Sequence, residues 1–236
     1  MAGRDLLEVE DVHSYIGQHH ILQGVSLHVR PEAVTVLLGR NGAGKTTTLR
    51  TIMGLVHPRR GAVRFAGRPI DRRAPHEIAR LGIGYVPEGQ GIFATLTVEE
   101  NLRVARLAED AESGRRLDRV LELFPDLARR LPARAGTLSG GQKQMLSIAR
   151  AFLNPNRLLL IDEPSKGLAP IVVDHLVEAL REMRRHVTVV LVEQNFAMAT
   201  ALGDDFYLID GGRTVRHGAM ATLAADRDLA VKYLGV

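Results

Sequence analysis

The chain has 236 residues, 31 of them basic and 27 acidic, and a formal net charge of +4. Having no cysteine, it cannot form a disulfide framework or a thiolate metal site. Aromatic residues make up only 4% of it and its arginine pairs are scattered, which favours a solvated surface over a nucleic-acid groove. Apolar runs reach only about five residues, too short to span a bilayer, and no apolar signal core follows Met1, so we expect a soluble chain.

The N-terminal region has the pattern of an antiparallel sheet. Residues 6–30 alternate apolar and polar side chains, which predicts strands with one buried face. We expect these strands to be interrupted near Gly17 and near Gly24, because glycine often marks a turn. The neighbouring His19 and His20 are interpreted as part of a solvated loop rather than as metal ligands.

A glycine-rich loop follows, between a buried strand predicted at 34–38 and a helix that begins near position 45. The stretch LGRNGAGKTTT fits G-x-x-x-x-G-K-S/T, whose glycines let backbone N–H groups face a phosphate at a helix N-terminus. The alternative is a glycine turn that arose by chance, but such a turn would have no reason to lie between a buried strand and a helix. Lys45 would reach the β- and γ-phosphates of ATP, and the Thr46 hydroxyl would bind Mg²⁺. The predicted nucleotide-binding residues are Gly39, Arg40, Asn41, Gly42, Ala43, Gly44, Lys45, Thr46 and Thr47.

The middle of the chain changes from strands to helices. We expect a short strand around 63–65, a hairpin at Gly67, a short helix over 76–82 and a strand over 83–86. Thr97 and Glu100 have the spacing of a capping box, and the pattern stays helical to about 135, broken by Pro125 and Pro132. We interpret 1–236 as a single domain, in which 1–90 and 154–236 form the core and 91–153 form a helical subdomain.

The sequence LSGGQ opens the next predicted helix. Ser139 and Gln142 form a second capping box, and the buried face of this helix is predicted to carry Met145, Ile148, Ala149 and Phe152. A capped helix alone explains Ser139 and Gln142, but neither Gly140 nor Gly141. Together with the helix N-terminus these glycines make a second anion cradle. One ATP needs one P-loop, so we expect this cradle to serve a nucleotide held by another chain.

A buried strand predicted at 158–161 ends in Asp162 and Glu163. Ligands of open α/β sheets lie beyond the carboxyl ends of the strands, so we expect Asp162 near Thr46 and Mg²⁺. Glu163 would then face the γ-phosphate and act as the catalytic base. An isolated Asp-Glu pair is usually a surface turn, but here it follows a buried strand.

The last third of the chain continues the α/β alternation. We expect a helix from Pro170 to about 184, a strand at 187–192, a helix near 196–202, and a hairpin at 210–212 before a small closing helix. Gln194 follows the strand at 187–192, so its amide would face the nucleotide and donate a hydrogen bond to the γ-phosphate.

Three motifs, GRNGAGKT, LSGGQ and LLLIDEP, occur in the order and spacing found in ATP-binding subunits of ABC transporters, which the whole chain resembles. The resemblance implies an α/β fold: a P-loop NTPase core of the ABC ATPase type with an N-terminal antiparallel β-subdomain and an inserted helical subdomain. It also implies ATP hydrolysis by a head-to-tail pair of subunits. Each ATP would lie between one P-loop and the signature of the other chain, formed here by Ser139, Gly140, Gly141 and Gln142.

A finer resemblance is to the shorter ATPase subunit of branched-chain amino acid importers, carried by YVPEGQGIFATLTVEENL, DEPSKGLAP, LVEQN and the closing KYLG. It implies a second ATPase subunit as partner, or a homodimer in isolation, with two membrane permease subunits and an extracytoplasmic substrate-binding protein. The chain would lie at the cytoplasmic face of the plasma membrane. Importers of urea, amides or other amino acids remain alternatives. Non-transport ABC ATPases usually have a coiled-coil insertion or tandem domains, which this sequence lacks.

The sequence departs from most ABC ATPases at several positions. The resemblance implies that Glu88, usually a glutamine, is a Mg²⁺ ligand and that Gln194, usually a histidine, is a catalytic residue. The neutral Gln194 also leaves open a regulatory module with weak hydrolysis. Lys166 is usually apolar in the subgroup. The aromatic residue that stacks on adenine is expected near Tyr15 or Ile16, and the sequence does not decide between them.

Overall fold

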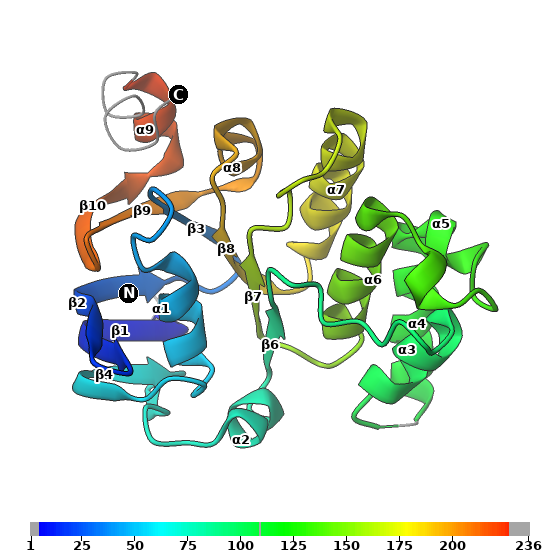
Figure 1. Ribbon diagram of the computed structural model, residues 1–236, viewed down its shortest axis with the longest axis horizontal. Helices are drawn as coiled ribbons and strands as arrows, with labels where there is room; N and C mark the ends of the chain where they lie inside the picture. Colours follow the sequence, from blue (N-terminus) through cyan, green and yellow to red (C-terminus); the bar gives the residue numbers. More distant parts are fainter. Residues whose placement is uncertain (1–4, 109, 227–236) are drawn as a thin grey trace.

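The computed structural model describes residues 5–108 and 110–226, and its strands form two sheets (Figure 1). The first sheet is antiparallel, in the order β2 (His19–Val29), β1 (Leu7–Ile16), β4 (Pro58–Phe65) and β5 (Arg68–Pro69). Alternate residues such as Leu7 and Val9 are buried on one face. The expected antiparallel arrangement of the N-terminal strands is thus confirmed.

The predicted interruption at Gly24 is wrong. β2 runs through this glycine, because Gln23 and Val25 pair with the adjacent residues His13 and Val12 of β1, which leaves Gly24 as the extra residue of a bulge. Its φ of +114° suits glycine. The assignment of His19 and His20 to a loop is also wrong: both pair with β1, and the turn is confined to 17–18.

The second sheet has the order β10 (Arg213–Ala219), β9 (Asp205–Asp210), β3 (Val34–Leu38), β8 (Thr188–Val192), β7 (Leu158–Asp162) and β6 (Ile83–Val86). Its strands are parallel except for β10. Every residue of β3, β7 and β8 is buried, as expected for a parallel sheet covered on both faces. Leu158 and Leu160 pack towards α1 (Lys45–Ile52) and the first sheet, whereas Leu159 and Ile161 pack towards the other helices.

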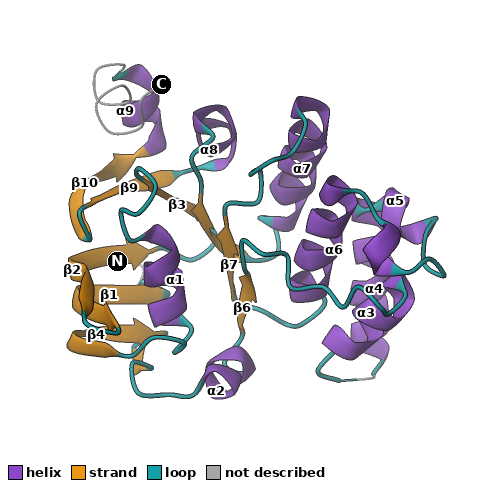
Figure 2. Cartoon of the chain, viewed as in Figure 1, coloured by secondary structure: helices purple, strands orange, loops and turns teal. Residues whose placement is uncertain are grey.

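Most helices gather on the side of the second sheet away from the first (Figure 2). They are α3 (Val98–Ala105), α4 (Ala111–Leu123), α5 (Pro125–Ala128), α6 (Gly140–Phe152), α7 (Pro170–Met183), α8 (Phe196–Leu202) and α9 (Met220–Ala225), with a 3₁₀ turn at Ala135–Thr137. The short α2 (Pro75–Arg80) lies on the other side, where its Ile78 packs in the same cluster as α1 and the first sheet. The helices from α3 to α6 are inserted between β6 and β7. Among the described residues, none of the helices is both long and apolar enough to cross a membrane.

The helical insertion follows the sequence signals with one addition. Both predicted capping boxes form, and the predicted buried face of α6 is confirmed. The break between α3 and α4 occurs without a proline, because Asp110 accepts a 2.7 Å hydrogen bond from the Ser113 N–H and starts a new helix. Pro125 begins α5, as a proline in the first helical turn can. The closing KYLG lies outside the described residues.

Candidate nucleotide site

The glycine-rich loop joins β3 to the N-terminus of α1. Gly39, Gly42 and Gly44 have φ values of +148°, +79° and +112°, which side chains disfavour. A Cβ atom on Gly39 would lie 2.2 Å from the carbonyl oxygen of Ile209, so packing requires glycine there as well. The loop borders a pocket of about 300 Å³ that Asn41, Gly42, Gly44, Lys45, Thr46, Thr47, Glu88, Glu163 and Lys166 help to line.

Lys45 lies inside this loop with only 4% of its surface exposed. Its Nζ atom donates hydrogen bonds to the carbonyl oxygens of Gly39, at 2.8 Å, and Arg40, at 3.1 Å. It also lies 3.4 Å from Oε1 of Glu163. A buried ammonium in a loop that leads into a helix N-terminus gives the positive environment that a phosphate chain requires.

Asp162 ends β7 directly beside the start of α1. Its Oδ1 atom accepts a 3.1 Å hydrogen bond from the Thr46 hydroxyl, and the Tyr85 hydroxyl lies 3.5 Å from Oδ2. Burial raises the pKa of Asp162 to about 6, against the opposing effect of the Thr46 hydrogen bond, and the charge of Glu163 adds to the rise. A hydroxyl and a carboxylate next to a phosphate-binding loop are the hard oxygen donors that suit a divalent cation such as Mg²⁺.

Glu163 and Gln194 meet at the edge of the sheet where β7 and β8 end. The Nε2 atom of Gln194 donates 2.6 Å hydrogen bonds to Oε1 of Glu163 and to Oδ1 of Asn41. Glu163 has a φ of +46°, which non-glycine residues rarely adopt. Its N–H donates to the carbonyl oxygen of Val192 at 2.9 Å, which ties this turn to β8. Residues expected to act on the γ-phosphate are therefore brought together across three loops.

Glu88 comes from the segment after β6 and lines the same pocket. Its carboxylate accepts a 2.6 Å hydrogen bond from Lys166, whose Nζ atom is also 3.5 Å from Oε2 of Glu163. The hydrogen bond to Glu88, with the charges of both carboxylates, raises the pKa of Lys166. The structure thus groups Glu88 with Lys166 and Glu163, a contact that motif spacing does not predict.

The LSGGQ residues occupy a different position, at the N-terminus of α6. Ser139 and Gln142 bond reciprocally, at 3.1 and 3.3 Å, in the predicted capping box. A Cβ atom on Gly141 would approach Val172 of the α7 helix to 2.5 Å, whereas Gly140 faces open space. These four residues do not line the P-loop pocket, and the Gly140 carbonyl oxygen accepts a 3.2 Å hydrogen bond from Nε2 of Gln90.

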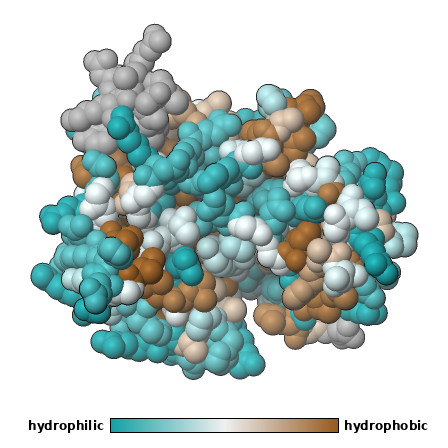
Figure 3. All heavy atoms as spheres, in the orientation of Figure 1, coloured by the Kyte–Doolittle hydropathy of each residue, from teal (hydrophilic) through white to brown (hydrophobic). Residues whose placement is uncertain are grey.

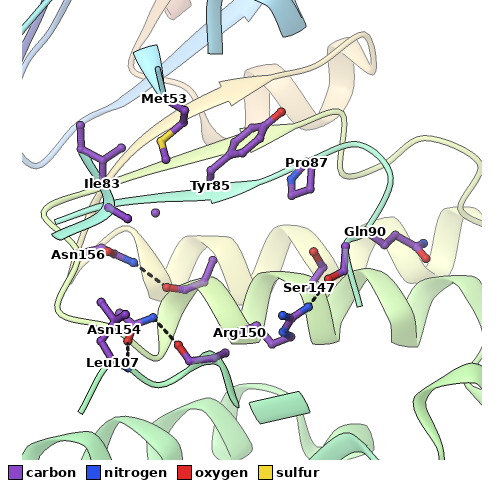
Figure 4. Close-up of a pocket in the computed structure, with 15 residues that line it drawn as sticks. Met53, Ile83, Tyr85, Pro87, Gln90, Leu107, Ser147, Arg150, Asn154 and Asn156 are labelled. Atoms are coloured by element: carbon purple, nitrogen blue, oxygen red, sulfur yellow. Dashed lines mark hydrogen bonds between the residues drawn. The ribbon is translucent and has the colours of Figure 1, made fainter. Parts of the chain in front are cut away.

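A second hollow lies between the β6 edge and the end of α6 (Figure 4). It has a volume of about 340 Å³ and its lining includes Tyr85, Pro87, Gln90, Leu107 and Arg150. Arg150 donates to the carbonyl oxygen of Gly91, which holds the segment after β6 against α6. The space-filling view in Figure 3 shows this face hollowed between the sheet half and the helical half of the molecule.

Tyr15 and Ile16 differ in their freedom to contact a base. The Tyr15 ring stacks on His20 at a centroid distance of 4.3 Å, and the guanidinium carbon of Arg59 lies 4.2 Å from its centroid. Two groups this close to one centroid must occupy opposite ring faces, so both faces of Tyr15 are covered. Ile16 is 43% exposed and is the freer of the two.

One buried carboxylate at the site, Glu193, is not among the residues predicted from the sequence. Glu193 is 1% exposed and accepts hydrogen bonds from the loops that follow β7 and β8. A charged residue directly after the apolar run Val189–Val192 was the signal that could have revealed it.

Known proteins resemble this chain along almost its whole length. Residues 22–166 match the family model described as ABC transporter. The chain is 41% identical over 232 residues to the high-affinity branched-chain amino acid transport ATP-binding protein BraG of Pseudomonas aeruginosa, covering 98% of this chain and 100% of BraG. It is 38% identical over 220 residues to the probable branched-chain amino acid transport ATP-binding protein LivF of Archaeoglobus fulgidus, covering 92% and 93% of the two chains.

Solved structures agree with this assignment. The structure titled as the ATP-binding subunit of an ABC transporter superposes with a TM-score of 0.83 at 33% identity, over 98% of this chain and 96% of that chain. The dimeric structure of MJ0796, a bacterial ABC transporter cassette, has a TM-score of 0.80 at 24% identity, over 91% and 98%, and shows the same fold. The chain therefore belongs to the ABC transporter family, in which it is an ATP-binding subunit that hydrolyses ATP.

Proposed function

We propose that this chain powers an importer of branched-chain or closely related amino acids. The observation that carries the proposal is the full-length similarity to two relatives named as branched-chain amino acid transport ATP-binding proteins. Glu88 and Gln194, which depart from most ABC ATPases, match the pattern of this importer subgroup. The substrate would bind elsewhere in the assembly, since the pocket bordered by the glycine-rich loop is suited to phosphate.

We assign the hydrolysis step to the residues at the sheet edge. The loop N–H groups and Lys45 would hold the phosphates of ATP, and Thr46 and Asp162, with Glu88, would hold Mg²⁺, which neutralises phosphate charge when bound. Glu163 would orient the attacking water and accept its proton. One N–H of the Gln194 Nε2 atom would keep Oε1 of Glu163 in place. Its second N–H, which Oδ1 of Asn41 accepts in the nucleotide-free chain, would contact the γ-phosphate when ATP binds.

The proposal also includes a contact with a second ATPase subunit. Ser139, Gly140, Gly141 and Gln142 would contact an ATP molecule bound to the P-loop of a second ATPase subunit, because they form a helix N-terminus that lies outside this chain's own pocket. We interpret residues 91–153 as the helical subdomain that carries these signature residues, and 1–90 with 154–236 as the nucleotide-binding core. Because the open face of Gly140 has no Cβ atom, a phosphate could approach the N-terminus of α6 closely.

The hollow between β6 and α6 is our proposed docking surface for a membrane permease subunit. Its wall includes Pro87, Gln90 and Gly91 from the segment after β6, and Leu107, which is 64% exposed. A second large apolar side chain, Phe93, is 50% exposed and lies against Arg150 of the same wall. Such a patch suits a short amphipathic segment of a partner. The chain would thus sit at the cytoplasmic face of the membrane, with a binding protein on the opposite side.

Reconstitution would test the proposal. The chain would be assembled in proteoliposomes with its second ATPase and two permeases, and uptake of radiolabelled leucine would be measured with the binding protein and ATP. We expect ATP-dependent uptake that excess valine reduces and that Glu163→Gln lowers. Uptake of urea or an amide with no uptake of leucine would contradict the substrate assignment. ATPase activity without any transport would contradict the importer assignment.

A further inference from the structure

The buried Glu193 carboxylate accepts hydrogen bonds from Ser165, Gln194 and Asn195 next to the nucleotide site, and we call this set of hydrogen bonds the clasp. Its Oε1 atom accepts a 3.0 Å hydrogen bond from the Ser165 N–H. Its Oε2 atom accepts three more, at 2.9 Å from the Ser165 hydroxyl and at 3.0 Å from the N–H groups of Gln194 and Asn195. Only 1% of the residue is exposed. The donors belong to two loops, one after β7 and one after β8, so a single carboxylate joins both.

This arrangement is chemically specific. A buried carboxylate is tolerated when several hydrogen bonds replace its hydration, and such charge-assisted bonds are stronger than neutral ones. A glutamine at position 193 could accept at one oxygen, but its NH₂ group would face donors at the other atom. An aspartate is one methylene shorter and would not reach both loops. The site therefore requires glutamate rather than a polar residue of similar size.

The clasp lies next to the residues assigned to hydrolysis. Gln194 follows Glu193 directly, and its amide bridges Asn41 and Glu163 at 2.6 Å each. Ser165 belongs to the turn that begins at Glu163, where the Lys166 N–H donates to the Glu163 carbonyl oxygen at 3.2 Å. Because the Glu193 carboxylate holds the backbones of both Ser165 and Gln194, it also fixes the distance between the Glu163 and Gln194 side chains.

We propose that Glu193 is a positioning residue that keeps the Gln194 amide on the Glu163 carboxylate. The inference rests on the proposed roles of those two residues in hydrolysis. Glu193 itself is buried and does not line the pocket bordered by the glycine-rich loop. Asn195 strengthens the effect, because its side chain caps α8 by accepting from the Met198 N–H at 3.0 Å, so the clasp also sets where that helix begins.

The test compares Glu193→Gln and Ser165→Ala with the control Glu178→Gln in the full-length chain. Glu178 is paired with Arg181 on the exposed surface of α7. Nucleotide affinity would be measured with a fluorescent ATP analogue, kcat by phosphate release, and loop opening by hydrogen exchange at 163–168 and 193–198. We expect Glu193→Gln to change affinity by less than about threefold and to lower kcat by about 10- to 100-fold, since small misplacements of catalytic groups have effects of this size.

We expect exchange at both loops to become faster in Glu193→Gln and, to a lesser degree, in Ser165→Ala, which keeps the carboxylate in case the first variant does not fold. A double-mutant cycle of Glu193→Gln with Gln194→Ala separates positioning from general stability. If Glu193 acts through Gln194, adding Glu193→Gln to Gln194→Ala causes little further loss of kcat. Additive losses, or unchanged exchange at both loops, would overturn the inference. A wild-type chain that binds ATP without hydrolysing it would instead refute the proposed function, and the exchange comparison would still decide whether the clasp exists.

Discussion

The ammonium nitrogen of Lys166 lies 2.6 Å from Oε1 of Glu88. Because Glu88 is also proposed as a Mg²⁺ ligand, the lysine and the metal would compete for one carboxylate. We predict that Lys166→Met lowers the Mg²⁺ concentration needed for half-maximal nucleotide binding, by about two- to threefold, since both side chains are partly exposed and such pairs are weak. Titration of Mg²⁺ with a fluorescent ATP analogue measures this, with Arg181→Met as control. An unchanged or higher requirement would mean that Lys166 does not compete with the metal.

Lys45→Ala should abolish nucleotide binding. The ammonium is the buried positive charge of the loop, whereas the other cation of the loop, Arg40, is exposed. The two backbone carbonyls that Lys45 contacts cannot replace its charge. Equilibrium dialysis with radiolabelled ATP checks the result, and circular dichroism checks that the variant is folded. Affinity close to that of the wild type in a folded variant would disprove the role assigned to the glycine-rich loop.

Glu163→Gln should retain ATP binding and lose hydrolysis. General-base steps contribute about 10²- to 10⁴-fold, and a glutamine amide cannot accept the proton from water. The expected product is a long-lived ATP-bound dimer that size-exclusion chromatography would detect. Turnover within a few-fold of wild type would show that another group is the base.

Ser139→Arg should stop hydrolysis at the site formed with the P-loop of the partner subunit. The arginine would fill the open side of the α6 N-terminus, which lies outside this chain's own pocket. We expect a larger loss of ATPase activity and uptake in the assembled transporter than Glu163→Gln causes, because the neutral Gln194 makes this chain's own site the weaker one when the partner has a histidine. If Ser139→Arg leaves hydrolysis nearly unchanged while Glu163→Gln stops it, this chain's own site is the stronger of the two ATP sites, contrary to the prediction. A role of Gln194 confined to holding its loop would give similar losses from both.

The Asp162 carboxyl should make the nucleotide-free chain less stable as pH rises from about 4 to about 6. Its pKa is raised from 3.8 to about 6 by burial, so in this interval the folded chain keeps a proton that the unfolded chain has lost. Stability therefore falls as pH increases across the interval. Urea denaturation in EDTA should show a flatter pH dependence for Asp162→Asn than for wild type. If the stability of Asp162→Asn changed with pH in the same way as that of the wild type, a group other than Asp162 would be responsible for the pH dependence.

The sequence predicted the second sheet well because its strands are short apolar runs with both faces buried. Asp162 and Thr46 were expected to meet for a geometric reason: parallel strands end at the same edge of a sheet, and the hydroxyl of Thr46 does donate to Asp162. The strand interruption at Gly24 was wrong because a bulge depends on which residues of the partner strand pair, and one strand alone does not contain that information.

The side-chain partners within the site were harder to predict. Pairing of Lys166 with Glu88 depends on two segments 78 residues apart. The four hydrogen bonds of Glu193 depend on the approach of two loops, and periodicity does not describe loops. Motif spacing identified which residues gather at the sheet edge, whereas their mutual orientation required the folded chain.

The hydrogen bond from Gln90 to the Gly140 carbonyl oxygen has a mechanical consequence. Gln90 stands in the wall of the hollow proposed for the permease, and Gly140 opens the helix proposed to contact the opposite ATP. A permease segment that pushed on Gln90 would act on the first turn of α6 through this bond, while the bond from Arg150 to the Gly91 carbonyl oxygen ties the same segment to a later turn of that helix. In the proposed assembly a single amide side chain would therefore connect the permease to the neighbouring nucleotide, so that a small shift at the membrane would reach the far site.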